Sequence, residues 1–279
     1  MKVMIIGSGP LPRENRGIAN AAGLRTEQFV CDIEGVHDIL LVTIEGKEEN
    51  APVKREEKKI NGKYMRHVSL FKGLSNLHSI LRKKRNTYAP DIIIGVNTFP
   101  AFLASTIVPK NTPFWADLNG WSLTEMQAQA YSMNTNAFLH KGLSVEQTIL
   151  KRADKVSVVS TPQKHACMGE LAMLGRLTKD TFRHRFVDVV ENACLPLRPH
   201  ERKKKRDIFR GILFPREAVV GVWIGGFNAW ADEKTLFDGV EKVMSHYENF
   251  HFVYTGDILP GIEEKKFPYF QKKSTALSI

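Results

Sequence analysis

Short apolar runs alternate with amphipathic stretches along most of this chain, and that alternation constrains the fold more than any other feature. Strands that alternate with helices favour a parallel sheet covered on both faces. The IIIGV run, apolar throughout, suits the middle of such a sheet. We therefore predict an α/β fold that begins with a Rossmann-like domain. Its expected strands are residues 3–6, 39–44, 65–70, 91–96, 113–117, 155–160 and 187–191, and its expected helices include 24–36, 74–84, 138–151 and 163–174.

The pattern breaks near residue 196, where LPLRPHERKKKRD carries two prolines and a run of positive charge. Such a segment is typical of a linker. We predict an N-terminal domain at 1–196, a basic linker at 197–215 and the start of a second Rossmann-like domain at 216–279. This last part has strands at 219–224 and 250–255 around a helix at 233–244. A single βαβ unit cannot bury both of its faces, so we expect it to be incomplete or to dock on something else.

Bulk composition limits the classes of protein that remain. The 279 residues are 43% hydrophobic and 25% charged, as in ordinary globular proteins. No apolar run is long enough to span a bilayer, and the first residues, MKVMIIGSGP, fit a strand better than a signal peptide. The chain has three cysteines, far apart in the sequence and odd in number. That usage indicates a cytoplasmic protein without a disulfide framework.

The net charge of +10 arises partly from basic clusters at 54–59, 82–85 and 202–206. A solvated surface is one interpretation of these clusters. Alternatives are a phosphate-bearing ligand or the anionic inner face of a membrane, with the protein bound peripherally. Nucleic acid is the least favoured partner, because zinc-finger spacing, RNA-binding aromatic motifs and basic heptads are all missing from the sequence.

The first expected strand ends in a glycine turn made of Gly7, Ser8 and Gly9. A dinucleotide fingerprint needs a third glycine at position 12, which is proline here. An acid at Glu45 follows Gly9 by about 36 residues, rather than the usual ~20. NAD binding is therefore weakly supported. The glycines serve either a tight turn or a loop that a ligand approaches closely.

Polar residues also follow the strand at 113–117. Asp117 and Asn119 stand at its carboxyl end, where α/β sheets bind ligands. A carboxylate there suits proton transfer or a contact with a sugar hydroxyl, and we predict catalytic roles for both residues. The alternative is helix capping, because Asp and Asn often begin helices.

A second glycine turn opens the C-terminal part, where an apolar strand is followed by Gly225, Gly226, Phe227 and Asn228. Main-chain N–H groups exposed by glycine near a helix start suit a pyrophosphate. Asp232 is the expected cap of the helix that begins at residue 233. A plain turn is the alternative.

Other chemistries find little support in the sequence. Metal-ligand spacings of His and Cys do not occur, so we expect no metal site. A G-x-S-x-G elbow and a phosphate-binding Walker loop are missing as well. His165 and Cys167 are two apart on an expected helix, so they point to different faces and form no nucleophilic pair.

Several segments together resemble family 4 glycosyltransferases. RENRGIANAAGLRTEQFVCDIEGVHDILLVT resembles the family's opening, with GVHD in place of G-H-x-V. ADKVSVVSTPQKHACMGEL and VDVVENACLP resemble its ADxVxxVS and VxPNGVD segments. VVGVWIGGFNAWADEKTLFDGVEKVMSHYENFHFVYTGD resembles the start of its second domain. The similarity runs over nearly the whole chain, and the order of the motifs is specific.

This resemblance implies the GT-B fold, in which two Rossmann-like domains face each other across a cleft. It implies a nucleotide-sugar donor as substrate, no cofactor and no required metal. Gly225, Gly226, Phe227 and Asn228 would hold the donor. The acceptor would be a saccharide or a lipid-linked molecule, as in the synthesis of cell-envelope polysaccharide. The turn at Gly7 would face the cleft from the other side.

The family's acidic pair, spaced E-x7-E, would fall after residue 279, and the adjacent Glu263 and Glu264 cannot replace it. We therefore expect an incomplete donor pocket and little transferase activity from the 279 residues alone. Two other functions stay open. One is a non-catalytic Rossmann-like interaction module that a partner completes, and the weaker one is an NAD-linked oxidoreductase.

Overall fold

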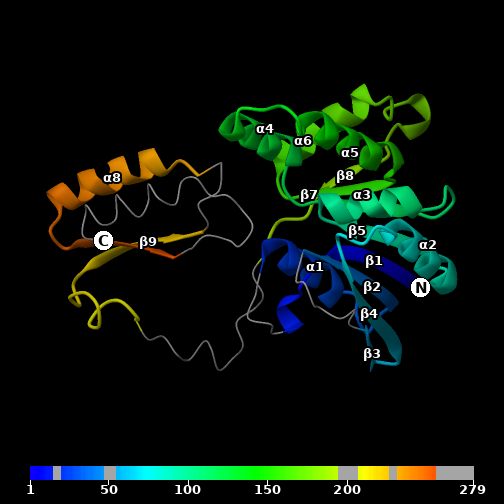
Figure 1. The fold of residues 1–279 in the computed structure, drawn as a ribbon, viewed down its shortest axis with the longest axis horizontal. Coiled ribbons are helices and arrows are strands. Elements are labelled where there is room, and N and C mark those ends of the chain that lie inside the picture. The colour runs from blue at the N-terminus through cyan, green and yellow to red at the C-terminus, as the bar shows by residue number, and fades with distance from the viewer. Residues whose placement is uncertain (15–19, 47–54, 194–206, 226–230, 256–279) are drawn as a thin grey trace. The chain divides into compact units, whose positions relative to one another are not determined.

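A computed structural model describes residues 1–14, 20–46, 55–193, 207–225 and 231–255 (Figure 1). By packing, the chain divides into two units. The first comprises Met1–Met126 and Asn136–Leu195, and the second comprises Gln127–Thr135 and Pro196–Ile279.

An eight-stranded sheet forms the first unit, in the order β3-β4-β2-β1-β5-β6-β7-β8. All neighbours are parallel except β3 and β4, which are antiparallel. The predicted parallel α/β sheet is thereby confirmed. The strands are β1 (Lys2–Ser8), β2 (Asp38–Glu45), β3 (Arg55–Ile60), β4 (Lys63–Phe71), β5 (Ile92–Val96), β6 (Phe114–Leu118), β7 (Lys155–Val158) and β8 (Val187–Val189).

Helices cover both faces of this sheet, as its alternating side chains require. Met4 and Ile6 of β1 belong to a large buried cluster, which the helices α2, α3, α5 and α6 complete. Val3 and Ile5 point the other way, into a smaller cluster that includes Val30 of α1. The helices are α1 (Ala21–Cys31), α2 (Leu77–Tyr88), α3 (Thr98–Ile107), α4 (Ser122–Met133), α5 (Leu139–Arg152) and α6 (Thr161–Met173), with short 3-10 turns at Pro12–Glu14 and Lys179–Thr181.

Two elements of the first unit were not predicted. α3 is apolar on nearly every side, because it lies buried between the sheet and α5, so it lacks the amphipathic period of a surface helix. β3 comes from a charged stretch for which a solvated surface was one interpretation, and residues 56–59 are exposed. It forms an edge strand, where charged side chains are favoured.

Besides the part of α4 from Gln127 onward, the described residues of the second unit form one βαβ element. β9 (Val219–Ile224) and β10 (Phe250–Thr255) pair in parallel, and α8 (Glu233–His246) connects them. Phe237 and Val240 of α8 pack against this pair and are buried with Phe252. The two strands and the helix predicted here are confirmed. Asp232 caps α8 as expected, accepting a hydrogen bond from the Thr235 N–H at 3.1 Å.

Candidate ligand site at the strand ends

The glycine turn after β1 is packed against α1. Gly7 is buried, and a Cβ there would lie 2.3 Å from Thr26 Cγ2. Glycine is required at this position because α1 approaches the strand so closely. The Ser8 N–H donates to Thr26 Oγ1 at 2.9 Å, and the Gly9 N–H donates to the Ile44 carbonyl at 3.1 Å. Both N–H groups already have partners, so this turn does not present them to an anion.

The same turn does not fit a dinucleotide fingerprint. In that motif the glycines lead directly into a helix whose N-terminus meets the pyrophosphate. Here α1 begins only at Ala21, and Asn20 caps it by accepting from the Gly23 N–H at 2.6 Å. Glu45 lies beside Gly9, since its Cγ is 3.0 Å from where a Cβ on Gly9 would stand. The acid is therefore near the turn, but the helix start is not.

Asn97, directly after β5, is one of the residues that the sequence interpretation missed. It has φ 73° and ψ 156°, a region that residues other than glycine rarely adopt. Its amide NH2 donates to the Ala22 carbonyl at 3.0 Å and to Ser8 Oγ at 3.4 Å. Strained backbone of this kind is concentrated at functional sites. The available signal was its place directly after the apolar IIIGV strand.

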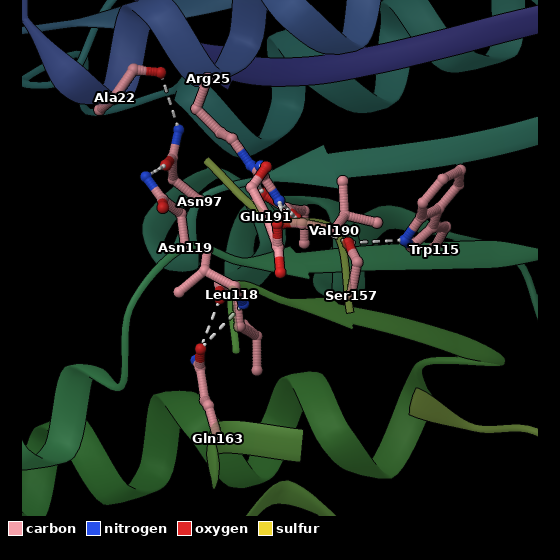
Figure 2. A network of polar contacts seen from close by, with 12 residues as sticks. Ala22, Arg25, Asn97, Trp115, Leu118, Asn119, Ser157, Gln163, Val190 and Glu191 are labelled. Carbon is pink, nitrogen blue, oxygen red and sulfur yellow. Dashed lines mark hydrogen bonds and ion pairs between the residues drawn. The ribbon is translucent and has the colours of Figure 1, made fainter. Parts of the chain in front are cut away.

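Asn119 lies next to Asn97. Its Nδ2 donates to Asn97 Oδ1 at 3.1 Å (Figure 2). Because Asn97 also donates to Ser8 Oγ, the ends of β1, β5 and β6 are joined through Ser8, Asn97 and Asn119. Ser8 and Asn119 are half-buried. Half-buried hydroxyl and amide groups at strand ends can donate hydrogen bonds to the hydroxyls of a saccharide and accept hydrogen bonds from them.

Asp117 is placed differently from Asn119, although only one residue separates them. Its side chain is completely buried. Oδ2 accepts from Arg25 Nε at 3.0 Å, and Oδ1 accepts from Arg25 Nη2 at 2.8 Å and from Ser157 Oγ at 2.5 Å. The predicted proton transfer or hydroxyl contact would need an accessible carboxylate, and this one has no surface and is already bonded through both oxygens.

Arg25 of α1 is the buried cation that matches Asp117. Only 2% of its surface is exposed. It also donates to the Val190 carbonyl at 2.7 Å and to the Glu191 carbonyl at 2.9 Å (Figure 2). Its guanidinium carbon lies 5.1 Å from the centre of the Phe29 ring. A bidentate guanidinium–carboxylate pair with further acceptors is the arrangement in which a buried charge is tolerated.

Two carboxyl groups hold the loop that follows Asn119. Ser122 Oγ donates to Glu146 at 2.8 Å, and Trp121 Nε1 donates to Glu170 at 2.9 Å. Burial raises the pKa of Glu146 to about 7, because the bond from Ser122 only partly offsets the loss of solvent and the charge of Glu170 adds to it. Burial also raises the pKa of Glu170. This loop is therefore held by groups that titrate above the usual carboxyl range.

In the second unit, Gly225 follows β9 and is exposed. The nearest atom to a Cβ on Gly225 would be Trp223 Nε1, at 3.7 Å. Gly226, Phe227 and Asn228 lie outside the described residues. Between α8 and the two strands is an apolar hollow of about 490 Å³, lined by residues that include Gly221, Trp223, Leu236 and Phe250.

Within the described part of the chain, His, Cys, Asp and Glu side chains form no group of three or more that could hold a metal ion. The described helices include none that is long and apolar enough to cross a membrane. Cys31 and Cys167 are free thiols, and Cys194 lies outside the described residues.

The fold resembles solved glycosyltransferase structures. A trehalose-6-phosphate synthase from E. coli bound with UDP-2-fluoro glucose matches with a TM-score of 0.56 and 11% identity, over 100% of this chain and 68% of that chain. A structure of OtsA without ligand matches with a TM-score of 0.61 and 10% identity, over 99% and 69%. The chain has the GT-B fold.

A third match is a trehalose-6-phosphate synthase studied for glycosyl transfer with retention, with a TM-score of 0.53 and 10% identity over 98% of this chain and 68% of that one. No protein-family model matches the sequence, and no match is found among curated proteins. At these identities the similarity establishes the fold, and the fold is shared along almost the full length of the chain.

Proposed function

We propose that the protein is a glycosyltransferase that transfers a sugar from a nucleotide-sugar donor to a saccharide or lipid-linked acceptor. The observation that carries this proposal is the GT-B fold, shared with sugar-nucleotide enzymes over 98–100% of the chain. The first unit binds the acceptor, and the second unit contains the start of the donor-binding domain. The motif order supports placement near family 4, with transfer that needs no metal.

Within this proposal, Asn119 and its neighbours Asn97 and Ser8 contact the acceptor or the transferred sugar. Asp117 has no direct contact with the substrates, because its carboxylate is buried, and it acts by holding Arg25 in place. Gly225, with Gly226, Phe227 and Asn228, holds the donor phosphates. Gly225 supports this role because it is exposed at the carboxyl end of a parallel strand.

Donor binding is tested by the thermal unfolding of the full chain with UDP, UDP-glucose, GDP-mannose and NAD. We expect a nucleoside diphosphate or its sugar to raise the midpoint, and NAD to leave it unchanged. Gly225→Val should abolish the shift, whereas Gly169→Ala, at another exposed glycine, should retain it. A shift with NAD alone would favour the oxidoreductase. Transfer of radiolabelled sugar from a nucleotide-sugar donor to a saccharide acceptor tests the activity itself.

We also propose a cytoplasmic protein that binds peripherally to an anionic membrane. Support comes from the C-terminal end of α6, where Met173 is 89% exposed, and from the segment after it, where Phe182 is 78% exposed. Lys179, Arg183 and Arg185 are exposed in the same stretch. Apolar side chains among basic ones are typical of interfacial contacts. Vesicles with phosphatidylglycerol should carry the protein in flotation, and Phe182→Ser with Arg185→Glu should abolish this. Flotation of this double variant equal to the unmodified chain would contradict the assignment.

One observation favours the interaction module as a second candidate. On the face of the two-stranded sheet that carries Val222 and Ile224, Ile224 is 83% exposed and Val222 is 42% exposed. Parallel sheets are normally covered on both faces, so this surface suits a protein partner. Sedimentation of the purified chain, alone and with proteins encoded by neighbouring genes, separates a monomeric enzyme from a module in a complex.

A further inference from the structure

Residues 207–214 form a compact turn that leads into β9 of the second unit (Figure 1). Asp207 begins this turn, and its Oδ1 accepts from the N–H groups of Phe209 and Arg210, at 3.1 Å and 2.8 Å. Gly211 has φ 77°, a conformation that glycine adopts without strain. The chain therefore reverses direction here through local hydrogen bonds and one glycine.

The backbone N–H groups of this turn find their acceptors within the turn itself. The Gly211 N–H donates to the Phe214 carbonyl at 2.6 Å. The next three N–H groups, those of residues 212–214, donate to the Phe209 carbonyl at 2.8–3.3 Å. Every N–H from residue 209 to residue 214 is thus bonded inside the turn. A backbone with satisfied donors enters an apolar phase without giving up hydrogen bonds to water.

The apolar side chains of the turn divide into an inner and an outer set. Phe209 and Phe214 are half-buried, and the Phe214 ring stacks on that of His251 of β10, with the ring centres 4.4 Å apart. This stacking fixes the turn to the two-stranded sheet. The outer set is aliphatic and exposed, and it consists of Ile208 at 63%, Ile212 at 70% and Leu213 at 66%. Large aliphatic side chains exposed together mark an interaction surface.

The charges around the turn favour an anionic surface as its partner. Arg210 Nε donates to Asp207 Oδ2 at 2.6 Å, so these two residues neutralise each other. The five residues that precede the turn in the sequence, 202–206, are all basic. Exposed aliphatic side chains next to a basic run are typical of segments that insert shallowly into the headgroup region of an anionic bilayer.

We propose that residues 207–214 are a membrane-inserting turn, from which Ile208, Ile212 and Leu213 enter the interface of an anionic bilayer. This turn adds a second contact to the peripheral membrane association proposed above and rests on that association. Two contacts are needed because a single small apolar contact gives only marginal binding, whereas stable anchoring takes two signals. The turn takes no part in sugar transfer, so a chain without transferase activity would leave this proposal intact.

Flotation of the full chain with vesicles of phosphatidylcholine and phosphatidylglycerol tests the insertion. Ile212→Ser with Leu213→Ser should lower the partition coefficient at least tenfold, because two aliphatic side chains no longer enter the apolar phase. Val222→Ser with Ile224→Ser is the matched control, since it removes two exposed aliphatic side chains from β9, and it should keep the unmodified value. An unchanged coefficient in the first double variant, or an equal loss in the control, would overturn the proposal.

The lipid composition tests the anionic character of the surface. The unmodified chain should bind vesicles of phosphatidylcholine alone at least tenfold more weakly than vesicles that contain phosphatidylglycerol. Equal binding to both would contradict the assignment to an anionic bilayer.

An added tryptophan reports insertion at the turn directly. With vesicles of brominated phosphatidylcholine and phosphatidylglycerol, Leu213→Trp should lose more fluorescence than the unmodified chain does. Tyr247→Trp, at an exposed position at the C-terminal end of α8, should lose no more than the unmodified chain. A chain that floats without extra quenching at residue 213 would refute the inserting turn and leave the peripheral association standing. A chain that does not float would refute both.

A second copy of the chain is the competing occupant of this surface. Sedimentation without lipid compares the unmodified chain with Ile212→Ser, Leu213→Ser. Equal, monomeric sedimentation of the two proteins supports the membrane proposal. Self-association of the unmodified chain that is lost in the variant would make the turn a contact between copies, and the membrane proposal would be wrong.

Discussion

The two glycine turns of this protein look alike in the sequence but differ in the structure. Each follows an apolar strand at its carboxyl end. The turn after β1 is closed, because Gly7 accommodates Thr26 and the N–H groups of Ser8 and Gly9 have partners. The turn after β9 opens with an exposed Gly225. The comparison shows that a glycine after a strand can serve close packing, as Gly7 does against Thr26 of α1, or can stay exposed, as Gly225 does.

One carboxylate in each unit, Asp117 and Asp232, extends this comparison and gives the largest expected effect on stability. Asp117→Ala leaves the Arg25 charge buried without its partner, and this should lower the free energy of unfolding of the first unit by about 3–5 kcal/mol. Asp232→Ala removes only an exposed helix cap and should cost about 1 kcal/mol. Urea unfolding of both variants measures the difference. Similar small losses in both would mean that the Arg25–Asp117 pair contributes little.

Glu146 gives the next effect, and it depends on pH. Its pKa is about 7 in the folded chain and 4.5 in the reference state, so the folded state holds the proton more tightly. Stability from this group is therefore fully present below about pH 4.5 and is lost as the pH rises through about 7. Glu146→Gln removes this loss, worth about 3 kcal/mol.

Thermal unfolding of Glu146→Gln and of the unmodified chain at pH 5 and pH 8 measures this effect. The variant should gain stability relative to the unmodified chain between the two pH values. Glu170→Gln, at a less buried carboxyl, is the matched control and should show a smaller gain. A difference between Glu146→Gln and the unmodified chain that stays constant with pH would contradict the assignment.

The glycines themselves give a smaller contrast. Gly7→Ala should destabilise the first unit by about 2 kcal/mol, because a Cβ would overlap Thr26 and α1 must move. A Cβ on Gly225 would make only an ordinary contact with Trp223, at 3.7 Å, so Gly225→Ala should change stability by less than about 0.5 kcal/mol. Thermal unfolding checks both. Equal effects of the two substitutions would show that the turns are equivalent after all.

Much of the fold followed from the sequence, because parallel strands buried on both faces form distinct apolar runs. The hairpin joining β3 and β4 was missed, although Asn61 and Gly62 both have positive φ and Asn-Gly is the strongest short hairpin signal. The charged residues of β3 lack the alternation of apolar and polar side chains that predicts a strand.

The site could be predicted less well. Position at a strand end identified Asn119, but it could not show that Asp117 would be buried, since its partner Arg25 is 92 residues away in the chain. Nothing local distinguishes Arg25 from the other basic residues of a basic protein. Asn97 was detectable in principle, because it follows a buried strand as Asn119 does.

The most direct test of the account compares the two glycine turns with a donor present. Hydrogen exchange is measured on the full chain with and without 10 mM UDP-glucose. We predict at least fivefold slower exchange in peptides covering residues 219–235 and no change in those covering residues 2–10. Protection at residues 2–10 with none at 219–235 would place the phosphates on the closed turn and contradict the account.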